Sequence, residues 1–489
     1  MVNGTGRRRV QVISRRVVHA DPPPAPSSVP RTIHLTPWDL RMLSLDYIQK
    51  GVLLPKPEPD RRVQPAELVD HLASAFARAL GRFHPFAGRL AADERADDGT
   101  VTVSLRCTGE GAEFVHAAAP GVTAADIAGA LYIPRDLVAS LFPLNGLASA
   151  DAASSSVDDG EDSDSRRRAR ASLLAAQVTE LADAVFVAVS LNHAVGDGTT
   201  FWHFVNTWSD LSRSGGGASA TTTSAHPLPV LERWFLDTCP VPVPLPFAKL
   251  EHAIRGYDRA TTLHECFFHF SAESVRKLKA AANAEVRSSE GADDAAMVTT
   301  ISSLQALLAH LWRAVSRARR LDPSQETAYV LLIGCRGRVK GIPPAGYVGN
   351  AVVPCKVTST AGEIQAKGLG WTAGQLNRAV ASFDEAALVR ESVKRWVRAP
   401  RLAYNTDMLS VAAVGTGSSP RFDVYGNDFG WGKPPLTVRS GPGNKLDGKT
   451  SVFEGRGGGG AVALEVCLAP DTLARLVADA EFMDAVTVP

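Results

Sequence analysis

The residues best suited to chemistry lie in one segment, where His193 follows the apolar run 184–191. That run is rich in valine, which predicts a buried strand, and the glycines after it let the backbone turn tightly. Thr199 or Thr200 is then expected to cap a helix. His193 would therefore stand at the carboxyl end of a strand, where α/β folds place their sites. Imidazole titrates near neutral pH, so His193 is a candidate general base toward a hydroxyl or an amine.

Structural roles compete with catalytic roles in this segment. A histidine at the end of a strand is often structural, but the strand, the paired glycines and the His-x-x-x-Asp spacing favour catalysis here. Asp197 lies between two glycines, a position typical of a turn or cap residue. We expect Asp197 to brace the loop rather than to contact substrate. No Gly-x-Ser-x-Gly sequence supplies a serine nucleophile, so the chemistry would need this base and an electrophile held nearby.

A second segment, 425–434, combines glycines with aromatic residues. Its core, Asp428-Phe-Gly-Trp-Gly432, indicates a rigid, sharply turned loop with a packed tryptophan. Kinases also carry Asp-Phe-Gly, but neither an H-R-D loop nor a glycine-rich nucleotide loop accompanies it here. The glycine run 457–460 lacks the Lys-Ser/Thr of a phosphate loop, which disfavours nucleotide binding by that route.

Length and composition limit the classes of protein to which the chain can belong. The chain has 489 residues, enough for two large domains or three small ones. Hydrophobic residues make up 45% and charged residues 21%, as in ordinary globular proteins. The formal charge of +1 gives no field that would attract a polyanion, so nucleic acid is not expected as a partner. The 6 cysteines are far apart with no C-x-x-C pair, so we expect thiols in a reducing compartment and no metal site.

The sequence carries no signal for membrane insertion or secretion. No apolar run approaches the ~20 residues that span a bilayer, and the opening lacks the apolar stretch of a secretory signal. We therefore expect a cytoplasmic protein without a membrane partner. The arginine-rich opening shares its composition with transit peptides, but we favour a flexible tail and edge strand over residues 1–30, with Val10, Val12 and Val17 in the strand.

Apolar periodicity predicts helices and strands that alternate along the chain. Helical spacing occurs at 68–80 and at 302–319, the latter behind Ser302 as a cap, whereas 184–191, 329–333 and 461–468 are strand candidates. This interleaving favours a two-domain α/β protein with mixed sheets.

Two stretches look unable to enter a core. Residues 149–170 join an acidic, serine-rich block to a basic block, which predicts a disordered insert within a domain. Residues 212–246 join a Gly/Ser/Thr tract to a proline-rich one and form the best candidate for a crossover linker. The predicted division is thus an N-terminal domain over 31–211 and a C-terminal domain over 247–489.

Together, His193-Ala-Val-Gly-Asp197 and Asp428-Phe-Gly-Trp-Gly432 resemble the motifs of the plant BAHD acyltransferases, which use acyl-CoA. Either motif alone would be weak, but the pair in this order and spacing is specific. The likeness begins near Ile33 and includes further blocks at 83–90, 304–313, 335–350 and 453–456. It implies two chloramphenicol-acetyltransferase-like domains with a channel at their interface. A CoA thioester would enter this channel from one face and the acceptor from the other.

The resemblance also implies roles for single residues. His193 would be the general base, and Asp197 would point away from the channel and pair with Arg336. Structural support of the site would come from Asp428, Gly430 and Trp431. The family's coenzyme A contacts map onto groups that suit phosphates, namely Lys277, Lys279, Ser302, Ser303 and Arg456. No metal and no bound cofactor are implied, because the CoA thioester is a co-substrate.

The sequence departs from the family pattern before the Asp-Phe-Gly loop. Gly417-Ser418-Ser419 stands where many members have Thr-Ser-Trp, whose Thr and Trp help hold the developing oxyanion or the acceptor. One missing oxyanion donor changes a rate by ~10²–10³. Ser418 and Ser419 are assigned to the substrate channel, together with Thr36 and Trp38. These segments resemble a poorly characterised branch of the family in which a lyase activity is also known.

The favoured function is a soluble, monomeric acyltransferase (EC 2.3.1.-) that moves an acyl group from acyl-CoA to a hydroxyl or amine of a small plant metabolite. One alternative is a lyase that uses His193 and the same channel on an acyl-amino-acid-like substrate without CoA. Another is a non-catalytic protein that binds a metabolite. Release of free thiol from acyl-CoA separates the first from the others, and turnover without CoA separates the second from the third.

Overall fold

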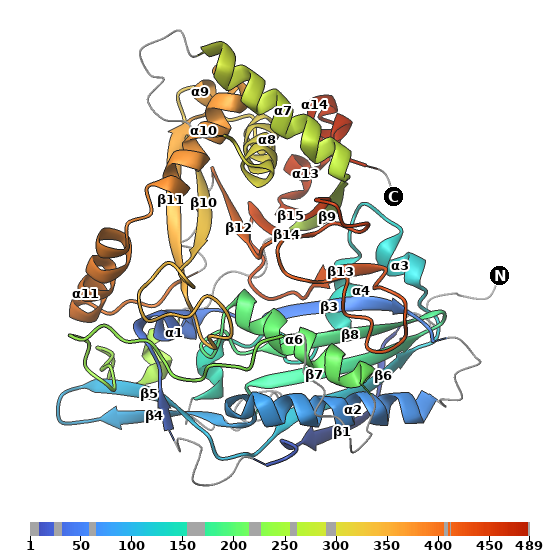
Figure 1. Cartoon of the computed structure of the whole chain (residues 1–489), viewed down its shortest axis with the longest axis vertical. Coiled ribbons are helices and arrows are strands. Elements are labelled where there is room, and N and C mark those ends of the chain that lie inside the picture. The colour runs from blue at the N-terminus through green and yellow to red at the C-terminus, as the bar shows by residue number, and fades with distance from the viewer. Residues whose placement is uncertain are drawn as a thin grey trace.

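Figure 1 shows a computed structural model of the chain, which describes residues 9–23, 32–57, 65–153, 172–214, 226–254, 262–289, 300–404, 409–410 and 412–487. One body is built on the sheet that contains β3 and β8, and the other on the sheet that contains β10 and β15. The predicted α/β class with two sheet-rich domains is confirmed.

The N-terminal sheet runs in the order β1-β6-β7-β8-β3-β13. Its strands are β1 (Gln11–Val18), β3 (Ile48–Pro55), β6 (Ala112–Ala119), β7 (Leu174–Leu181), β8 (Ala184–Leu191) and β13 (Thr437–Ser440). β6 and β7 are parallel, and the other neighbours are antiparallel. β8 is buried along its whole length between two strands, which explains its continuous apolar sequence. The predicted strand at 184–191 is confirmed.

The last strand of the N-terminal sheet comes from far along the chain. β13 pairs antiparallel with β3, with Thr437 opposite Leu53 and Ser440 opposite Lys50. Each half of the chain therefore contributes strands to this sheet. The two domain ranges remain a prediction, and the structure adds this crossing strand to them.

The C-terminal sheet runs in the order β11-β10-β12-β14-β15-β9, with β12 parallel to both of its neighbours. Its strands are β9 (His264–Phe270), β10 (Glu326–Gly334), β11 (Val352–Thr360), β12 (Ala413–Gly417), β14 (Lys449–Glu454) and β15 (Val462–Leu468). A smaller sheet runs β2 (Thr32–His34), β5 (Thr100–Arg106) and β4 (Arg89–Arg95). The strands predicted at 329–333 and 461–468 are confirmed as β10 and β15.

Long helices cover the sheets (Figure 1). α2 (Pro65–Arg82) and α6 (Gly198–Arg213) pack together against the N-terminal sheet, and α7 (Ala272–Ser289), α8 (Ser303–Ala318) and α10 (Gly368–Ala381) lie side by side beyond the C-terminal sheet. Both predicted helices are confirmed as α2 and α8. Ser302 caps α8 as predicted, because its Oγ accepts from the Gln305 backbone N–H at 3.3 Å.

Shorter elements connect these parts. The short α-helices are α1 (Pro37–Arg41), α3 (Ala124–Ala128), α4 (Arg135–Ser140), α9 (Ala361–Ala366), α11 (Glu391–Arg398), α13 (Pro470–Val477) and α14 (Ala480–Asp484). Single turns of 3-10 type are η1 (Met42–Ser44), η2 (His84–Ala87), η3 (Ser149–Ala152) and η4 (Leu250–Ala253), and η5 (Glu385–Arg390) is a π-type turn.

The prediction of a disordered insert over 149–170 is wrong at its start. Ser149–Ala152 form the turn η3, and Ser149 and Ala150 are fully buried. Asp151 accepts a hydrogen bond from the Ala148 backbone N–H at 2.7 Å, so this acidic residue closes the turn. Acidic composition alone did not reveal that local role. Residues 154–171 lie outside the part of the chain that the structure describes.

Parts of the predicted linker and tail are also ordered. Ser212 belongs to α6, and Leu236 and Leu245 are buried, so apolar residues among the prolines enter the core. β1 stands at the edge of its sheet, as predicted, and pairs with β6. Residues 1–8, 24–31 and 215–225 lie outside the described residues.

Among the described residues, no helix is long and apolar enough to cross a membrane. The same residues contain no group of three or more His, Cys, Asp or Glu side chains placed to hold a metal ion. Each of the 6 cysteines lies in the described part and is free.

Candidate active site

The backbone of His193 is held on both sides at the carboxyl end of β8. Its N–H donates to the Ser149 Oγ at 2.9 Å, and its carbonyl accepts from the Asn350 Nδ2 at 2.9 Å. The preceding residue, Asn192, donates from Nδ2 to the Ser149 carbonyl at 2.9 Å. Residues from both halves of the chain therefore fix the position of the histidine.

The His193 side chain is half-buried, and its buried Nδ1 has no hydrogen-bond partner among the described residues. Burial lowers the pKa of the ring below its usual value, and the nearby charge of Asp197 opposes that shift. This lowering of the pKa favours the neutral ring, which is the state that a general base requires.

Asp197 is the N-cap of α6, so the prediction that Thr199 or Thr200 caps this helix is wrong. The Asp197 Oδ1 accepts from the backbone N–H groups of Thr199 at 3.0 Å and Thr200 at 3.1 Å. Its backbone is extended, as an N-cap requires, and the positive end of the helix dipole favours a carboxylate there. The interpretation of Asp197 as a turn or cap residue is confirmed.

The predicted ion pair between Asp197 and Arg336 is present and buried. Arg336 donates from Nη1 to Oδ2 at 2.7 Å and from Nη2 to Oδ1 at 2.9 Å, and the Ala351 N–H donates to Oδ2 at 3.0 Å. The two side chains are 8% and 3% exposed for Arg336 and Asp197. Burial alone would raise the pKa of the Asp197 carboxyl, but Arg336 and the hydrogen bonds hold it below its usual value. Both carboxylate oxygens are therefore occupied away from the histidine ring.

A second polar network, which sequence reasoning missed, holds the histidine loop from the other side. The buried Asp39 carboxylate accepts from the backbone N–H and the Nδ2 of Asn350, both at 2.9 Å. Arg233 donates to the carbonyls of Val348 at 2.7 Å and Val195 at 3.1 Å. Asn350 ends the block 335–350 noted above, but Arg233 lies in the predicted linker, where composition indicated no site role.

Of the two residues near α1 that were predicted to line the channel, Thr36 is the N-cap of this helix and Trp38 lies in its first turn. Thr36 is fully buried and caps this helix, exchanging hydrogen bonds with Asp39. The structure thus gives its hydroxyl a structural role that the sequence analysis did not foresee. Trp38 is buried and stacks on Trp234 with ring centroids 5.2 Å apart. Its Nε1 has no hydrogen-bond partner among the described residues.

The loop 428–432 is sharply turned, as predicted, and docks onto α6. Asp428 accepts from Arg213 Nε at 2.9 Å and from the Gly430 N–H at 3.0 Å, and Gly430 has φ +91°. The fully buried aromatic is Phe429, whose ring centroid lies 5.0 Å from that of Trp208. Trp431 is half-buried and packs against the N-terminal core, as predicted, so both aromatics of this loop are packed.

Ser418 and Ser419 follow directly after β12. Ser418 has φ +75°, and its Oγ is buried without a hydrogen-bond partner in the described part of the chain. The Ser419 Oγ accepts from the Arg421 N–H at 3.2 Å. Ser418 is therefore the serine whose hydroxyl is buried without any hydrogen bond in the described part of the chain, whereas the Ser419 oxygen accepts one.

The five predicted coenzyme A contacts lie along α7, the start of α8 and the loop after β14. Ser302 uses its Oγ as a cap, and Ser303 is the first residue of α8. Lys277 is 76% exposed and pairs with Glu273 at 3.0 Å, whereas Lys279 is half-buried. Arg456 is exposed, and its carbonyl accepts from the His269 ring at 3.2 Å. The glycine loop after Arg456 approaches the start of α7, since a Cβ on Gly459 would lie 3.9 Å from that of Ala272.

A group of interior lysines was also missed. Lys50 on β3, Lys445 before β14 and Lys449 at the start of β14 lie between the two sheets, where they influence one another electrostatically. The available signal for Lys50 was a charged residue in the middle of the apolar run 48–55.

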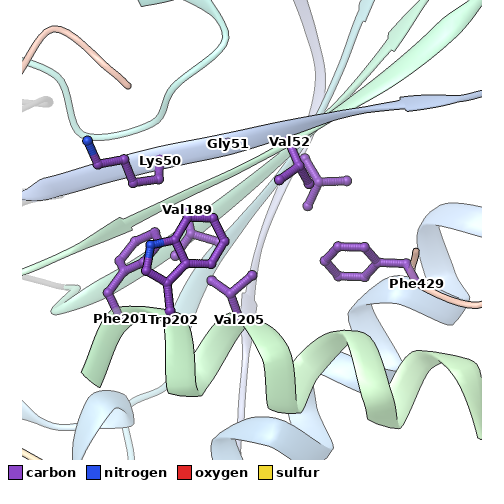
Figure 2. Close-up of a pocket in the computed structure, with 9 residues that line it drawn as sticks. Lys50, Gly51, Val52, Val189, Phe201, Trp202, Val205 and Phe429 are labelled. Carbon is purple, nitrogen blue, oxygen red and sulfur yellow. The ribbon is translucent and has the colours of Figure 1, made fainter. Parts of the chain in front are cut away.

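Figure 2 shows a small cavity between β3 and α6. Its volume is about 10 Å³, room for roughly one water molecule. Val52, Val205 and Phe429 line it, and the Lys50 nitrogen lies at the end farthest from Phe429. This cavity is too small for a metabolite, so it is not the acceptor site.

Comparisons with known proteins identify the group to which this arrangement belongs. The sequence matches the family model described as "Transferase family" over residues 8–483. It is 34% identical to an uncharacterized acetyltransferase of Arabidopsis thaliana over 92% of this chain and 94% of that protein. It is 31% identical to BAHD acyltransferase DCR of the same species, over 97% of this chain and 92% of that one.

Solved structures share the fold. TRI101 of F. sporotrichioides, crystallised with coenzyme A and T-2, superimposes with a TM-score of 0.68 over 93% of this chain and 99% of that one. The two sequences are 19% identical, so this likeness concerns the fold alone.

Proposed function

Because the chain belongs to the Transferase family of BAHD acyltransferases, we propose that it moves an acyl group from an acyl-CoA thioester to a hydroxyl or amine of a small metabolite. In this proposal His193 is the general base. Asp197 and Arg336 position its loop.

The observation that carries the proposal is the state of His193. Its backbone is bonded on both sides, while its buried Nδ1 has no partner among the described residues. A fixed, neutral imidazole can accept a proton without a change of structure. The carboxylate of Asp197 is committed to Arg336, so it serves positioning rather than proton transfer.

The reaction follows from these groups. The acceptor hydroxyl or amine attacks the thioester carbonyl as His193 removes its proton, and a tetrahedral intermediate forms. Collapse of the intermediate breaks the C–S bond, and the proton on His193 passes to the leaving thiolate. No covalent bond to the protein is needed. Ser418 has a buried, unused hydroxyl that suits donation to the developing oxyanion.

Coenzyme A is the co-substrate of the proposal, and a fold neighbour is known in complex with it. Lys277, Lys279, Ser302, Ser303 and Arg456 supply cationic and hydroxyl groups for its phosphates. A channel between the two halves, a monomeric state and a cytoplasmic location complete the proposal.

The test is to incubate the protein with each combination of a set of acyl-CoAs and a set of acceptors. Mass spectrometry detects the products, and free thiol is measured in parallel. We expect an acylated product and an equal amount of free CoA thiol. The lyase alternative predicts turnover of an acyl-amino-acid-like substrate without CoA. Product formation without thiol release, or no product with any pair, would contradict the proposal.

A further inference from the structure

Lys449 projects its ammonium group into space that a neighbouring glycine leaves open. β12 and β14 are parallel, with Gly415 opposite Lys449 and Gly417 opposite Ser451. A Cβ built on Gly417 would lie 2.8 Å from the Lys449 Nζ and 3.1 Å from its Cε. Any larger residue at 417 would displace this amine. Gly417, directly before Ser418, therefore leaves the space that the Lys449 amine occupies.

The interior lysines differ in their partners. Lys445 is neutralised, because its Nζ contacts Glu265 and lies 2.6 Å from the Glu465 carboxylate. The Lys50 Nζ instead donates to the Ser440 Oγ at 2.6 Å and the Ser451 Oγ at 3.1 Å. Within the described residues, no carboxylate lies within ion-pair distance of Lys50 or Lys449. Two of the three cations thus have no anion beside them.

The surroundings disfavour charge on both amines. Burial lowers the pKa of Lys449 to about 8, and the Lys445 charge adds to this effect. Burial likewise lowers the pKa of Lys50 to about 7, against the pull of Glu465. The positive charge of Lys449 also reaches His193 and lowers the pKa of its ring. Lys449 is therefore near enough to the candidate base to act on it electrostatically.

Both lysines remain accessible. Each is half-buried rather than fully buried, although protein surrounds it closely enough to shift its pKa. A small anion from solvent would therefore reach them without unfolding of the sheets. The coenzyme A contacts proposed above lie on α7, α8 and the loop after β14, so the lysines are not needed for the CoA phosphates.

We propose that Lys449, supported by Lys50, binds a carboxylate of the acceptor next to His193. The substrate class is then hydroxy or amino acids rather than neutral alcohols or amines. This inference rests on the proposed function, because it assumes that the bound acid is the acyl acceptor. Its test measures binding alone and needs no catalysis. Charge-assisted hydrogen bonds of lysine to a carboxylate stabilise the complex, and the glycine at 417 is the feature that admits them.

Binding is measured by calorimetry without CoA, with three hydroxy acids as probes, each beside its methyl ester: 3-hydroxybenzoate, 4-hydroxycinnamate and malate. For at least one acid we expect about tenfold or tighter binding than for its ester. Titration in two phosphate-free buffers of different ionisation enthalpy should show uptake of up to about half a proton at pH 8, because the bound anion raises the pKa of Lys449.

Two variants and a control test whether the preference for the acid and the proton uptake depend on Lys449. Lys449→Met should reduce the preference for the acid to within about twofold and abolish the proton uptake. Gly417→Ala should weaken the preference in the same direction by pushing the amine aside. Lys356→Met, which removes a half-exposed lysine on β11, should leave both quantities unchanged.

Equal binding of acids and esters by the parent protein, no binding of any acid, or retention of the preference in Lys449→Met would overturn this inference. These results are distinct from failure of the proposed function. Acid-selective binding with no acyl transfer in the matrix of substrates would remove the transferase proposal alone. Acyl transfer without acid selectivity would remove the carboxylate subsite alone.

Discussion

At the level of single residues, the proposed chemistry depends on the protonation state of His193. Sequence reasoning located this histidine correctly at the end of a buried strand, because a valine-rich run and paired glycines are local signals. The same reasoning assigned the cap of α6 to a threonine. The carboxylate of Asp197, one residue before the helix, outcompetes the hydroxyls because it accepts two backbone N–H groups at once.

The pH dependence of the reaction should follow the His193 ring. A general base is active when neutral, so kcat/KM should fall as the pH drops through the pKa of the ring. Burial lowers that pKa below 6.5, so the acidic midpoint should lie below 6.5. The profile is measured with a substrate whose own groups do not titrate between pH 4 and pH 8. A midpoint above 6.5 would show that another group, or a charged histidine, controls the rate.

The Asp197–Arg336 pair should behave as a coupled unit. Removal of one partner leaves a buried charge and should cost about 3–5 kcal/mol, so Asp197→Asn and Arg336→Met should each be destabilising. The double variant should cost less than the sum of the two, because neither charge then remains unpaired. Urea unfolding of the four proteins measures the cycle. Additive losses would mean that the two side chains are not coupled in solution.

At the scale of elements, the turn η3 was the clearest miss. Its composition is that of a disordered acidic block, yet Ser149 is buried and accepts hydrogen bonds from the Asn192 side chain and from the His193 backbone. The contact between Ser149 and His193 joins residues that are 44 positions apart in the sequence. Composition within a short window carries no information about such a partner.

Loss of the Ser149 hydroxyl should therefore impair the site more than the fold. In Ser149→Ala the His193 N–H loses its acceptor, which should cost about 1–3 kcal/mol of stability and lower kcat through a misplaced ring. The matched control is Ser140→Ala, which removes an exposed serine whose hydroxyl bonds only within its own turn. Stability comes from urea unfolding, and kcat from thiol release. Equal kcat in both variants would remove the positioning role of η3.

At the scale of the whole molecule, the two halves meet through buried charges that the sequence did not reveal. The net charge of +1 concealed their arrangement, because summed composition does not report which charges are paired. The crossing strand β13 was equally invisible, since its four residues carry no mark of the sheet that they join. Periodicity predicted the main strands and helices because each signal is local.

Two lysines four positions apart should have opposite effects on stability. Lys445→Met leaves Glu265 and Glu465 without their shared cation and should destabilise the protein by about 3–5 kcal/mol. Lys449→Met removes an amine whose pKa is lower in the folded chain than in the unfolded chain. As the pH falls toward 8, the unfolded chain protonates Lys449 more readily than the folded chain does, and this difference favours unfolding. Removal of the amine should therefore stabilise the protein at pH 7. Melting curves of both variants measure these changes in stability. Destabilisation by Lys449→Met would show that this amine has a counter-anion in solution.

Turnover of His193→Gln with the best acyl-CoA and acceptor tests whether His193 is the general base. Glutamine is polar and similar in size, but it cannot take up a proton at neutral pH. We expect kcat to fall by about 10²–10⁴, with the affinity for CoA and the melting curve nearly unchanged. Turnover of the variant equal to that of the parent protein would show that His193 is not the general base.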